Sequence, residues 1–155
     1  MKEKIPEITI KLGDTTYETN HQEELKVARE TIDQDMIEQA PLYAWYAVLA
    51  EMLDEMVGNR KLDLSVLEGQ LYNEYKKKAL EVSAKVTDKA VDSEVKQDER
   101  FIAATLDVLT AKKNKGIFTA ITKAFEHRKE MLINLGAKFR KEMDGDVIFK
   151  RKEKE

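Results

Sequence analysis

Most of the chain places apolar residues three or four positions apart, which is the spacing of an amphipathic helix. A first helix is predicted from an N-cap at Asn20 to about Gln39. Pro41 then begins a second helix, which Gly58 ends, because proline favours the first helical position and glycine the residue after the last. The predicted inward face of the second helix is Leu42, Trp45, Tyr46, Leu49, Met52, Leu53 and Met56.

The helical spacing continues through the rest of the chain. A third helix is predicted over residues 64–84, and Thr87 caps a fourth. Residues 114–116 indicate a stop before a closing helix over 117–143. One long helix over 88–142 is the alternative, because an interior glycine costs only about 1 kcal/mol. The predicted inward residues are Leu67, Leu71, Tyr75 and Val82, followed by Val91, Val95, Ile102, Leu106 and Leu109.

Residues 7–18 alternate apolar and polar side chains, which is the pattern of a strand. Ile8 and Ile10 share one face, and Gly13-Asp14 is a two-residue turn with glycine first, so a β-hairpin is predicted. A lone hairpin is marginally stable in water, so it should lean on the helices or on another strand. Residues 146–149 are the candidate for that strand.

These elements predict an all-α, oligomeric bundle of four to five antiparallel helices with a small N-terminal β-hairpin. Its parts are a hairpin arm over 1–20, a helical domain over 21–143 and a flexible basic tail over 144–155. A length of 155 residues fits one domain. The chain has no cysteine, no apolar leader and no long apolar segment, so we expect a cytoplasmic protein without a membrane span.

Charge divides the chain unevenly. Residues 1–58 hold 5 Lys+Arg and 13 Asp+Glu, whereas the remaining residues hold 22 and 17, so a net charge of -3 hides an acidic and a basic part. The segment from Lys112 to Lys141 carries nine basic side chains and two acidic ones. Such a division suggests contact between subunits, or an acidic flank that restrains loose binding to nucleic acid.

The basic segment also carries a seam of residues at heptad spacing, which predicts helix packing, within one chain or between chains. Arg128 occupies one seam position, and Asp98 lies on the apolar face of the preceding helix. If the chain turns at 114–116, these two residues come close, and a buried ion pair that sets the register is predicted; a ligand role for Arg128 is the alternative. The predicted oligomerisation seam is Phe118, Ile121, Phe125, Leu132, Leu135 and Phe139.

A second basic cluster, Lys76, Lys77 and Lys78, follows two tyrosines, Tyr72 and Tyr75. Lysines beside aromatic rings are typical of proteins that hold single strands without sequence preference, because the cations contact phosphates and the rings stack on bases. A solvated helix face is the alternative interpretation of the same cluster.

Catalytic and metal-binding patterns are lacking. His21 and His127 are the only histidines and have no partner at ligand spacing, and no glycine-rich phosphate loop is present. Asp144-Gly145-Asp146 lacks the further oxygen ligands of a calcium loop. We therefore expect a protein that is not an enzyme and that uses no metal or other cofactor.

The order of these features resembles the UvsY family of phage recombination-mediator proteins. The resemblance spans roughly residues 33–142. It rests on Leu42-Tyr43-Ala44-Trp45, the aromatic and basic helix 72–80, Lys85-Val86-Thr87-Asp88, Asp98, and the closing helix 128–140. The hairpin and the tail have no counterpart, and the interval from Asp98 to Arg128 is about one heptad longer than in the family.

The resemblance implies a helical homo-oligomer without enzymatic activity in the host-cell cytoplasm. It implies binding of single-stranded DNA and contact with a phage or host recombinase and with the single-strand-binding protein, in DNA recombination and repair. The family's basic DNA-binding helix corresponds to Lys76, Lys77 and Lys78, with Lys85 beyond it, and Tyr75 directly precedes Lys76. The alternative is a helical oligomeric adaptor or inhibitor that binds a host or phage protein.

Overall fold

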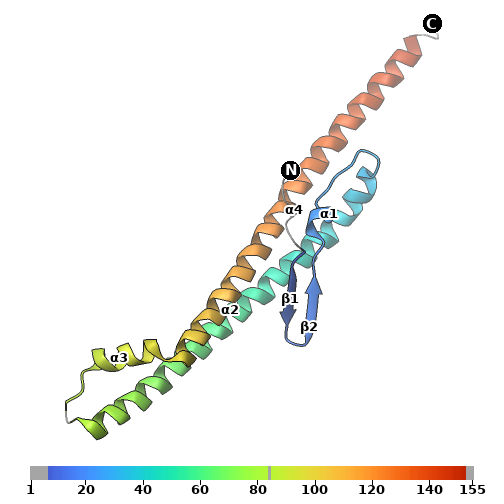
Figure 1. Cartoon of the computed structure of the whole chain (residues 1–155). Coiled ribbons are helices and arrows are strands. Elements are labelled where there is room, and N and C mark those ends of the chain that lie inside the picture. Colours follow the sequence, from blue (N-terminus) through green and yellow to red (C-terminus); the bar gives the residue numbers. More distant parts are fainter. Residues whose placement is uncertain (1–6, 84, 153–155) are drawn as a thin grey trace, which may run out of the picture. The chain divides into compact units, whose positions relative to one another are not determined.

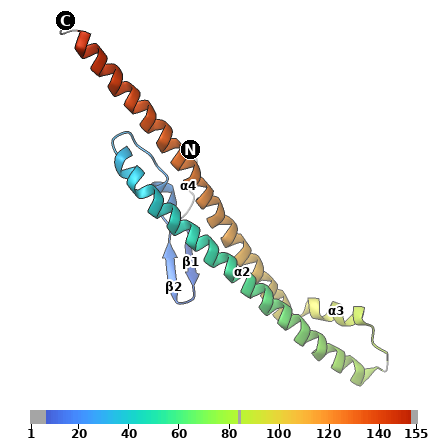
Figure 2. The same ribbon diagram turned by 180° about the vertical axis from the view of Figure 1, so that it is seen from behind.

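The computed structural model describes residues 7–83 and 85–152, with side chains up to 144. Contacts divide the chain into two compact units: residues 1–49 with 118–155 form unit 1, and residues 50–117 form unit 2. The elements are β1 (Thr9–Leu12), β2 (Thr15–Glu18), α1 (His21–Glu24), α2 (Ile32–Val82), α3 (Asp88–Gln97) and α4 (Glu99–Lys152) (Figure 1). In each unit a segment of α2 runs antiparallel to a segment of α4, as Figure 2 shows from behind. The predicted mostly helical fold with an N-terminal hairpin is confirmed.

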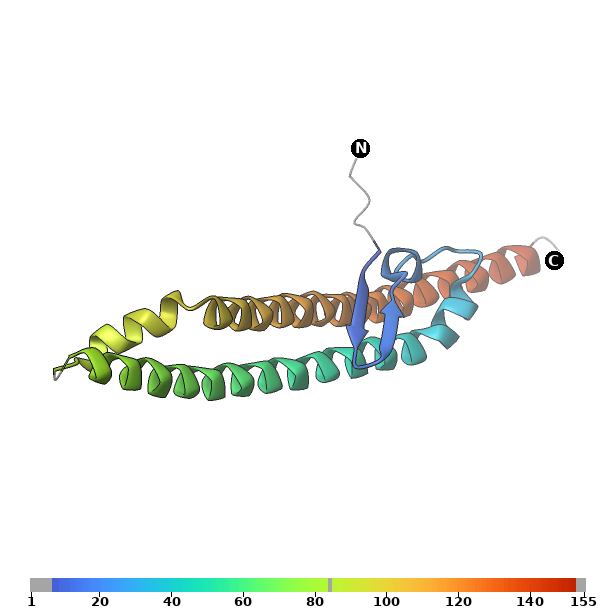
Figure 3. The ribbon, with the colours of Figure 1, turned by 60° about the horizontal axis from the view of Figure 1, so that its bottom comes forward.

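The β-hairpin belongs to unit 1 and forms as predicted. Ile10 pairs with Tyr17 and Leu12 with Thr15, so the turn is Gly13-Asp14. Gly13 has a φ of 60° and no other described residue has a positive φ, which matches a type II′ turn with glycine first. Ile10 and Leu12 are buried, and the Tyr17 ring meets the edge of Trp45 on α2 at 6.4 Å. The hairpin therefore leans on a helix (Figure 3).

No third strand joins the hairpin among the described residues, because residues 146–149 lie in the last turns of α4. The prediction of a strand there is wrong, and α4 continues past Met143 to Lys152. Residues 146–149 directly continue a helix that has already formed. Each residue added to such a helix gains a backbone hydrogen bond, so helix rather than strand is favoured there.

The predicted helix ends near the N-terminus are also wrong. Helix α1 has only four residues, its N-cap Asn20 makes no side-chain capping bond, and α2 begins at Ile32. Pro41 lies inside α2 rather than at its start. Proline removes one backbone donor and crowds the carbonyl four residues back. Pro41 and Ile37 are both exposed, so water can reach that carbonyl, and packing of α2 on both sides of Pro41 stabilises the continuous helix.

Gly58 and Gly116 do not end their helices either. Both lie within exposed turns of α2 and α4, where an added Cβ would meet nothing within 4 Å. Each costs about 1 kcal/mol of helix propensity, which the buried neighbours Val57 and Phe118 outweigh. The alternative of one long helix over 88–142 is closer to the structure than the predicted stop at 114–116, because only Asp98 separates α3 from α4.

Thr87 caps α3 as predicted, since its Oγ1 accepts a hydrogen bond from the backbone N–H of Ala90 at 3.4 Å. Asp98 has an extended backbone after α3 and its Oδ1 accepts the backbone N–H of Arg100 at 2.7 Å. Asp98 therefore acts as the N-cap of α4, and this side chain sets the bend between the two helices.

The core of unit 1 is aromatic. The Tyr46 ring stacks on Phe125 with centroids 4.9 Å apart and lies 6.2 Å from Phe118, and all three side chains are fully buried. Tyr46 also donates a hydrogen bond of 2.7 Å to Glu24 of α1. Burial and this hydrogen bond both raise the pKa of Tyr46, so the hydroxyl stays protonated and ties α1 to the core.

The core of unit 2 lies between α2, α3 and α4. Leu71, Val91 and Val95 form one buried cluster, as predicted for their helices. Other predicted inward residues face outward: Ile102, Leu106 and Leu109 of α4 are about half-exposed or more. The predicted face is correct for Val91 and Val95 but wrong from Ile102 to Leu109, because the bend at Asp98 changes which side of α4 meets α2. The buried residues of α4 here are instead Val108 and Ala111.

Candidate nucleic-acid interface

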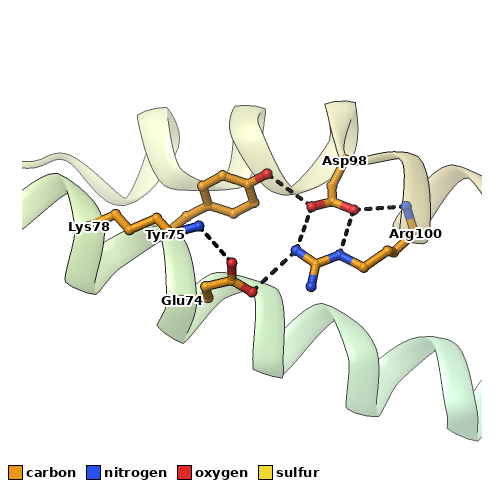
Figure 4. A network of polar contacts seen from close by, with 5 residues as sticks. All are labelled: Glu74, Tyr75, Lys78, Asp98 and Arg100. Carbon is orange, nitrogen blue, oxygen red and sulfur yellow. Dashed lines mark hydrogen bonds and ion pairs between the residues drawn. The ribbon is translucent and has the colours of Figure 1, made fainter.

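Lys76, Lys77 and Lys78 lie in unit 2, on the last turns of α2, where α3 and the start of α4 pack against it. Lys85 follows the end of α2, and Figure 4 draws Lys78 of this set. Three consecutive helical positions cover most of a helix circumference, so the three side chains point in different directions. Lys77 and Lys78 are exposed, and Lys76 is half-buried. The structure thus keeps all three amines within reach of solvent.

Five side chains of this region form one polar network, drawn in Figure 4. Tyr75 donates a 2.9 Å hydrogen bond to Asp98 Oδ2, and Arg100 binds the same carboxylate through Nη2 at 2.8 Å and Nε at 3.1 Å. Arg100 Nη2 also lies 3.2 Å from Glu74 Oε2, and Lys78 Nζ lies 2.7 Å from Glu74 Oε1. The network joins α2 to the bend between α3 and α4.

The network shifts several pKa values in consistent directions. Hydrogen bonds from Arg100 lower the pKa of Asp98 well below its usual range, and the bond to Asp98 raises the pKa of Tyr75. The bond with Lys78 lowers the pKa of Glu74 and raises that of Lys78. Every charged group of the network is therefore held in its charged form at neutral pH.

A second group of contacts lies between α2 and the start of α3. Tyr72 donates a short hydrogen bond to Asp88, and Lys76 Nζ lies 3.2 Å from the same oxygen of Asp88. Lys76 Nζ also lies 5.2 Å from the centre of the Tyr72 ring, a cation–π distance. The hydrogen bond from Tyr72 lowers the pKa of Asp88, and the bonds with Tyr72 and Asp88 raise that of Lys76.

Carboxylates therefore accompany most of the predicted DNA-binding side chains. Among the described residues, the side chains of Lys77 and Lys85 are exposed and make no hydrogen bond or ion pair, whereas Lys76, Lys78 and Tyr75 each have an acidic partner. Residues 71–100 carry seven basic and seven acidic side chains, so this region has no net charge. Among the predicted DNA-binding residues, Lys77 and Lys85 are therefore the ones whose amines have no carboxylate partner in the described part of the chain.

The predicted ion pair between Asp98 and Arg128 is wrong. Asp98 pairs with Arg100 in unit 2, whereas Arg128 pairs with Asp35 in unit 1. The prediction required a turn at 114–116, but α4 is continuous there. Asp98 directly precedes α4 and Arg128 lies far along it, so the two residues cannot lie opposite each other.

Arg128 is instead the centre of a buried polar cluster in unit 1, with 3% of its surface exposed. Its Nη2 donates to Asp35 Oδ1 at 2.8 Å, and its Nη1 donates to Gln39 Oε1 at 2.7 Å and to the Asp35 carbonyl at 3.1 Å. Gln39 in turn donates to the Phe125 carbonyl at 2.7 Å, and Thr31 donates to Asp35 Oδ2 at 2.9 Å. The cluster fastens the start of α2 to α4.

The sequence contained a signal for this cluster. Asp35 and Gln39 continue the buried row of Tyr46, Leu49 and Leu53 toward the N-terminus at helical spacing, so they are polar residues in apolar positions. The predicted helix break at Pro41 hid that continuity, because it places Asp35 and Gln39 on a different helix from Tyr46.

The predicted oligomerisation seam is largely covered within one chain. Phe118, Ile121, Phe125 and Leu132 are buried, and two of them contact Tyr46 of α2. The seam therefore closes inside unit 1, and from Phe118 to Leu132 it leaves no exposed surface for a second copy. The last two members, Leu135 and Phe139, are half-buried. Arg29 covers the Phe139 ring at 4.7 Å.

Unit 1 also contains an open groove of about 820 Å³ between α2 and α4. Its wall includes Met36, Tyr43 and Ile133, and Tyr43 donates a 3.2 Å hydrogen bond to Glu126 at the rim. Gly136 allows a close approach here, since an added Cβ would lie 2.7 Å from Met36 Cε. The groove wall also includes Gln39, Lys129 and Glu130, so it presents both apolar and charged contact surface.

The described residues contain no group of three or more His, Cys, Asp or Glu arranged to hold a metal ion. His21 is buried beside the Thr19 hydroxyl at 3.2 Å, and His127 is exposed on α4. None of the described helices is long and apolar enough to cross a membrane.

Comparison with protein-family models, curated proteins and solved structures finds no match to this chain. The resemblance to the UvsY family therefore rests on the short motifs in the sequence alone.

Proposed function

We propose that this protein is a non-catalytic, single-stranded-DNA-binding recombination mediator that helps to load a strand-exchange recombinase in phage recombination and repair. The proposal rests on the side chains at the end of α2 and just after it. There Lys77 and Lys85 are exposed and make no side-chain hydrogen bond or ion pair among the described residues. On the same stretch of helix, Tyr72 and Tyr75 each have a lysine over the ring, Lys76 and Lys78 respectively. Cations beside aromatic rings suit a phosphate backbone with unstacked bases.

In the proposed complex, Lys77 and Lys85 contact phosphates directly. Lys76 and Lys78 can exchange their carboxylate partners for phosphate oxygens, because ion pairs at an exposed surface contribute little to stability. The rings of Tyr72 and Tyr75 are half-buried against the cluster of Leu71, Val91 and Val95, and each has a lysine amine over it. In the proposed complex a base stacks on a ring when its lysine moves to a phosphate. Contacts from lysine amines to phosphates carry no sequence information, which fits binding without sequence preference.

The neutral balance of residues 71–100 favours weak binding by each copy. A mediator has to release the strand to the recombinase, and weak contacts repeated over several copies allow both retention and step-wise release. Contacts with the recombinase and the single-strand-binding protein are part of the proposal and rest on the resemblance, with the acidic residues 1–58 as the candidate region.

Fluorescence anisotropy with labelled oligo-dT at two salt concentrations tests the proposal. Wild-type protein should bind at low salt and lose affinity steeply as salt rises, because phosphate contacts release counterions. The double variant Lys77→Glu/Lys85→Glu should lose at least tenfold in affinity. The matched control Lys61→Glu, which reverses another exposed lysine of α2, should lose far less. Absence of binding at low salt, or binding that ignores salt, refutes the proposal.

The groove of unit 1 favours a second candidate function, an adaptor or inhibitor that binds another protein. Met36, Tyr43 and Ile133 present apolar surface there, rimmed by Glu126 and Glu130. The variant with Lys76, Lys77 and Lys78 replaced by glutamate discriminates between the two functions. The mediator loses oligonucleotide binding in this variant, whereas an adaptor has no such binding to lose.

A further inference from the structure

Unit 2 exposes apolar side chains on the outward sides of both long helices. Leu62 and Val66 of α2 are 64% and 52% exposed. Each follows a buried residue, Leu53 or Val57, by nine positions, which is a rotation of about 180° around the helix. The side chains of Leu62 and Val66 therefore point directly away from the core of unit 2.

Helix α4 has a matching outward row. Ile102, Leu106 and Leu109 are 46%, 57% and 53% exposed, and they follow one another by four and three positions. Leu106 and Leu109 each precede a buried residue, Val108 or Ala111, by two positions, a rotation of about 200°. Scattered exposed leucines are ordinary, but two rows at helical spacing on opposite sides of one hairpin indicate two contact surfaces.

The two rows lie at the same level along the hairpin. In an antiparallel pair, residues at one level have numbers with a constant sum, and the contact of Asp54 with Lys115 at 2.6 Å sets that sum at 169. Leu62 with Leu106, and Val66 with Ile102, each give 168. A second copy that is shifted at right angles to the helix axes, with no shift along them, therefore brings its α4 row against the α2 row of the first.

Charges follow the same register. Glu55 lies seven residues before Leu62 and Lys113 lies seven residues after Leu106, so each continues its row on the same face. Their numbers also add to 168, which places the carboxylate opposite the amine in the displaced copy. Both side chains are exposed and have no partner among the described residues of their own chain. Opposite charges at this level favour the register that pairs the apolar residues.

The exposed area is sufficient for such contacts. The chain exposes 11935 Å², whereas a compact monomer of 17.9 kDa exposes about 8,000 Å². A standard interface removes about 800 Å² from each partner, so two faces per chain need about 1,600 Å². The excess of about 3,900 Å² belongs to the whole chain and is larger than two such faces need.

We infer that a second copy of this chain covers the outward face of α2 in unit 2 with the outward face of its own α4. The two faces differ, so the contact is head-to-tail and each copy offers one free face to the next, which closes into a ring when the rotation allows. This inference rests on the homo-oligomer of the proposed function and replaces the seam over 118–139 with a different surface.

Light scattering coupled to size-exclusion chromatography tests the inference. Wild-type protein should run as an oligomer, and Leu62→Glu and Leu106→Glu should each run near the monomer mass of 17.9 kDa. Val82→Glu is the matched control, since Val82 is 89% exposed at the end of α2 and lies outside both rows. A monomeric wild type, or variants with the wild-type mass, overturns the inference.

Mixing the two variants tests the head-to-tail arrangement. Leu62→Glu keeps an intact α4 face and Leu106→Glu keeps an intact α2 face, so an equimolar mixture should form a one-to-one dimer that cannot grow. A mixture that stays monomeric overturns the arrangement. If either variant shows altered circular dichroism, Glu55→Lys and Lys113→Glu decide instead: each alone should weaken assembly, and the double variant should restore it. A double variant no better than the singles refutes the register.

The oligo-dT assay on the wild type separates this inference from the proposed function. If the wild type is an oligomer that Leu62→Glu and Leu106→Glu each dissociate, but it binds no oligonucleotide, the mediator function is refuted and the interface stands. Oligonucleotide binding by a protein whose mass is unaffected by Leu62→Glu and Leu106→Glu refutes the interface and leaves the function standing.

Discussion

Replacement of Arg128 by methionine should destabilise unit 1 strongly. Arg128 is 3% exposed and makes four hydrogen bonds, of which two reach the Asp35 residue and one reaches Gln39. Methionine fills much of the same volume, so the loss is mainly electrostatic. It leaves the Asp35 carboxylate in a nearly buried site with Thr31 as its remaining side-chain donor. Removal of one partner of a buried ion pair costs about 3–5 kcal/mol.

The structure also predicts how this cost can be recovered. The double variant Asp35→Leu/Arg128→Met removes both charges and should regain most of the stability, because a buried ion pair offsets its own desolvation only in part. The Nε atom of Arg128 already lacks a hydrogen-bond partner among the described residues, which strengthens this expectation. The free energy of unfolding from urea titrations followed by circular dichroism measures both effects.

A loss below about 1 kcal/mol for Arg128→Met would refute the reasoning, since surface ion pairs contribute that little. A double variant that is as unstable as the single one would show that Gln39 and the backbone carbonyls, rather than Asp35, determine the cost. The companion variant Asp98→Ala should add its effect independently to that of Arg128→Met, because the two residues share no partner.

Three further outcomes follow from the contacts. Phe125→Ala should cost about 3–5 kcal/mol of unfolding free energy in urea titrations, because Phe125 is fully buried against Tyr46; a smaller loss would contradict the aromatic core. The folded-state pKa of Asp98 is lowered, so its contribution to stability is fully present above the ordinary aspartate pKa and is lost as pH falls from that value through the lowered folded-state pKa. Acid titrations should therefore destabilise the wild type more than Asp98→Asn. Asp88→Asn should raise affinity for oligo-dT by releasing Lys76, whereas the exposed control Asp92→Asn should not; equal affinities would show that Asp88 does not compete with phosphate.

Local chemistry explains which predictions from the sequence were correct. The hairpin depends on a glycine with positive φ and on period-two alternation, and the start of α3 depends on the hydroxyl of Thr87. Each of these features involves neighbours within a few residues, so no distant contact had to be known. The aromatic and aliphatic seam from Phe118 to Leu132 was also recognisable, because a buried helical face repeats every three or four residues.

The candidate site was predictable in its composition but not in its contacts. The position of Lys76, Lys77 and Lys78 on a helix beside tyrosines is visible in the sequence. That Asp88 and Glu74 would hold two of these lysines depends on how α3 and α4 meet α2. Only the packed structure therefore separates Lys77, which is unpaired among the described residues, from its two neighbours.

By itself, the sequence determined that this chain is helical, where its hairpin turns and which residue caps α3, because those features are decided within one or two turns of chain. The tertiary structure alone decided that α2 continues through Pro41 and Gly58 and that α4 continues through Gly116. It also decided the partners of Arg128 and Asp98 and the closure of the seam inside unit 1. The physical reason is that helix breakers cost about 1–3 kcal/mol each, and packing of long apolar faces outweighs that local cost.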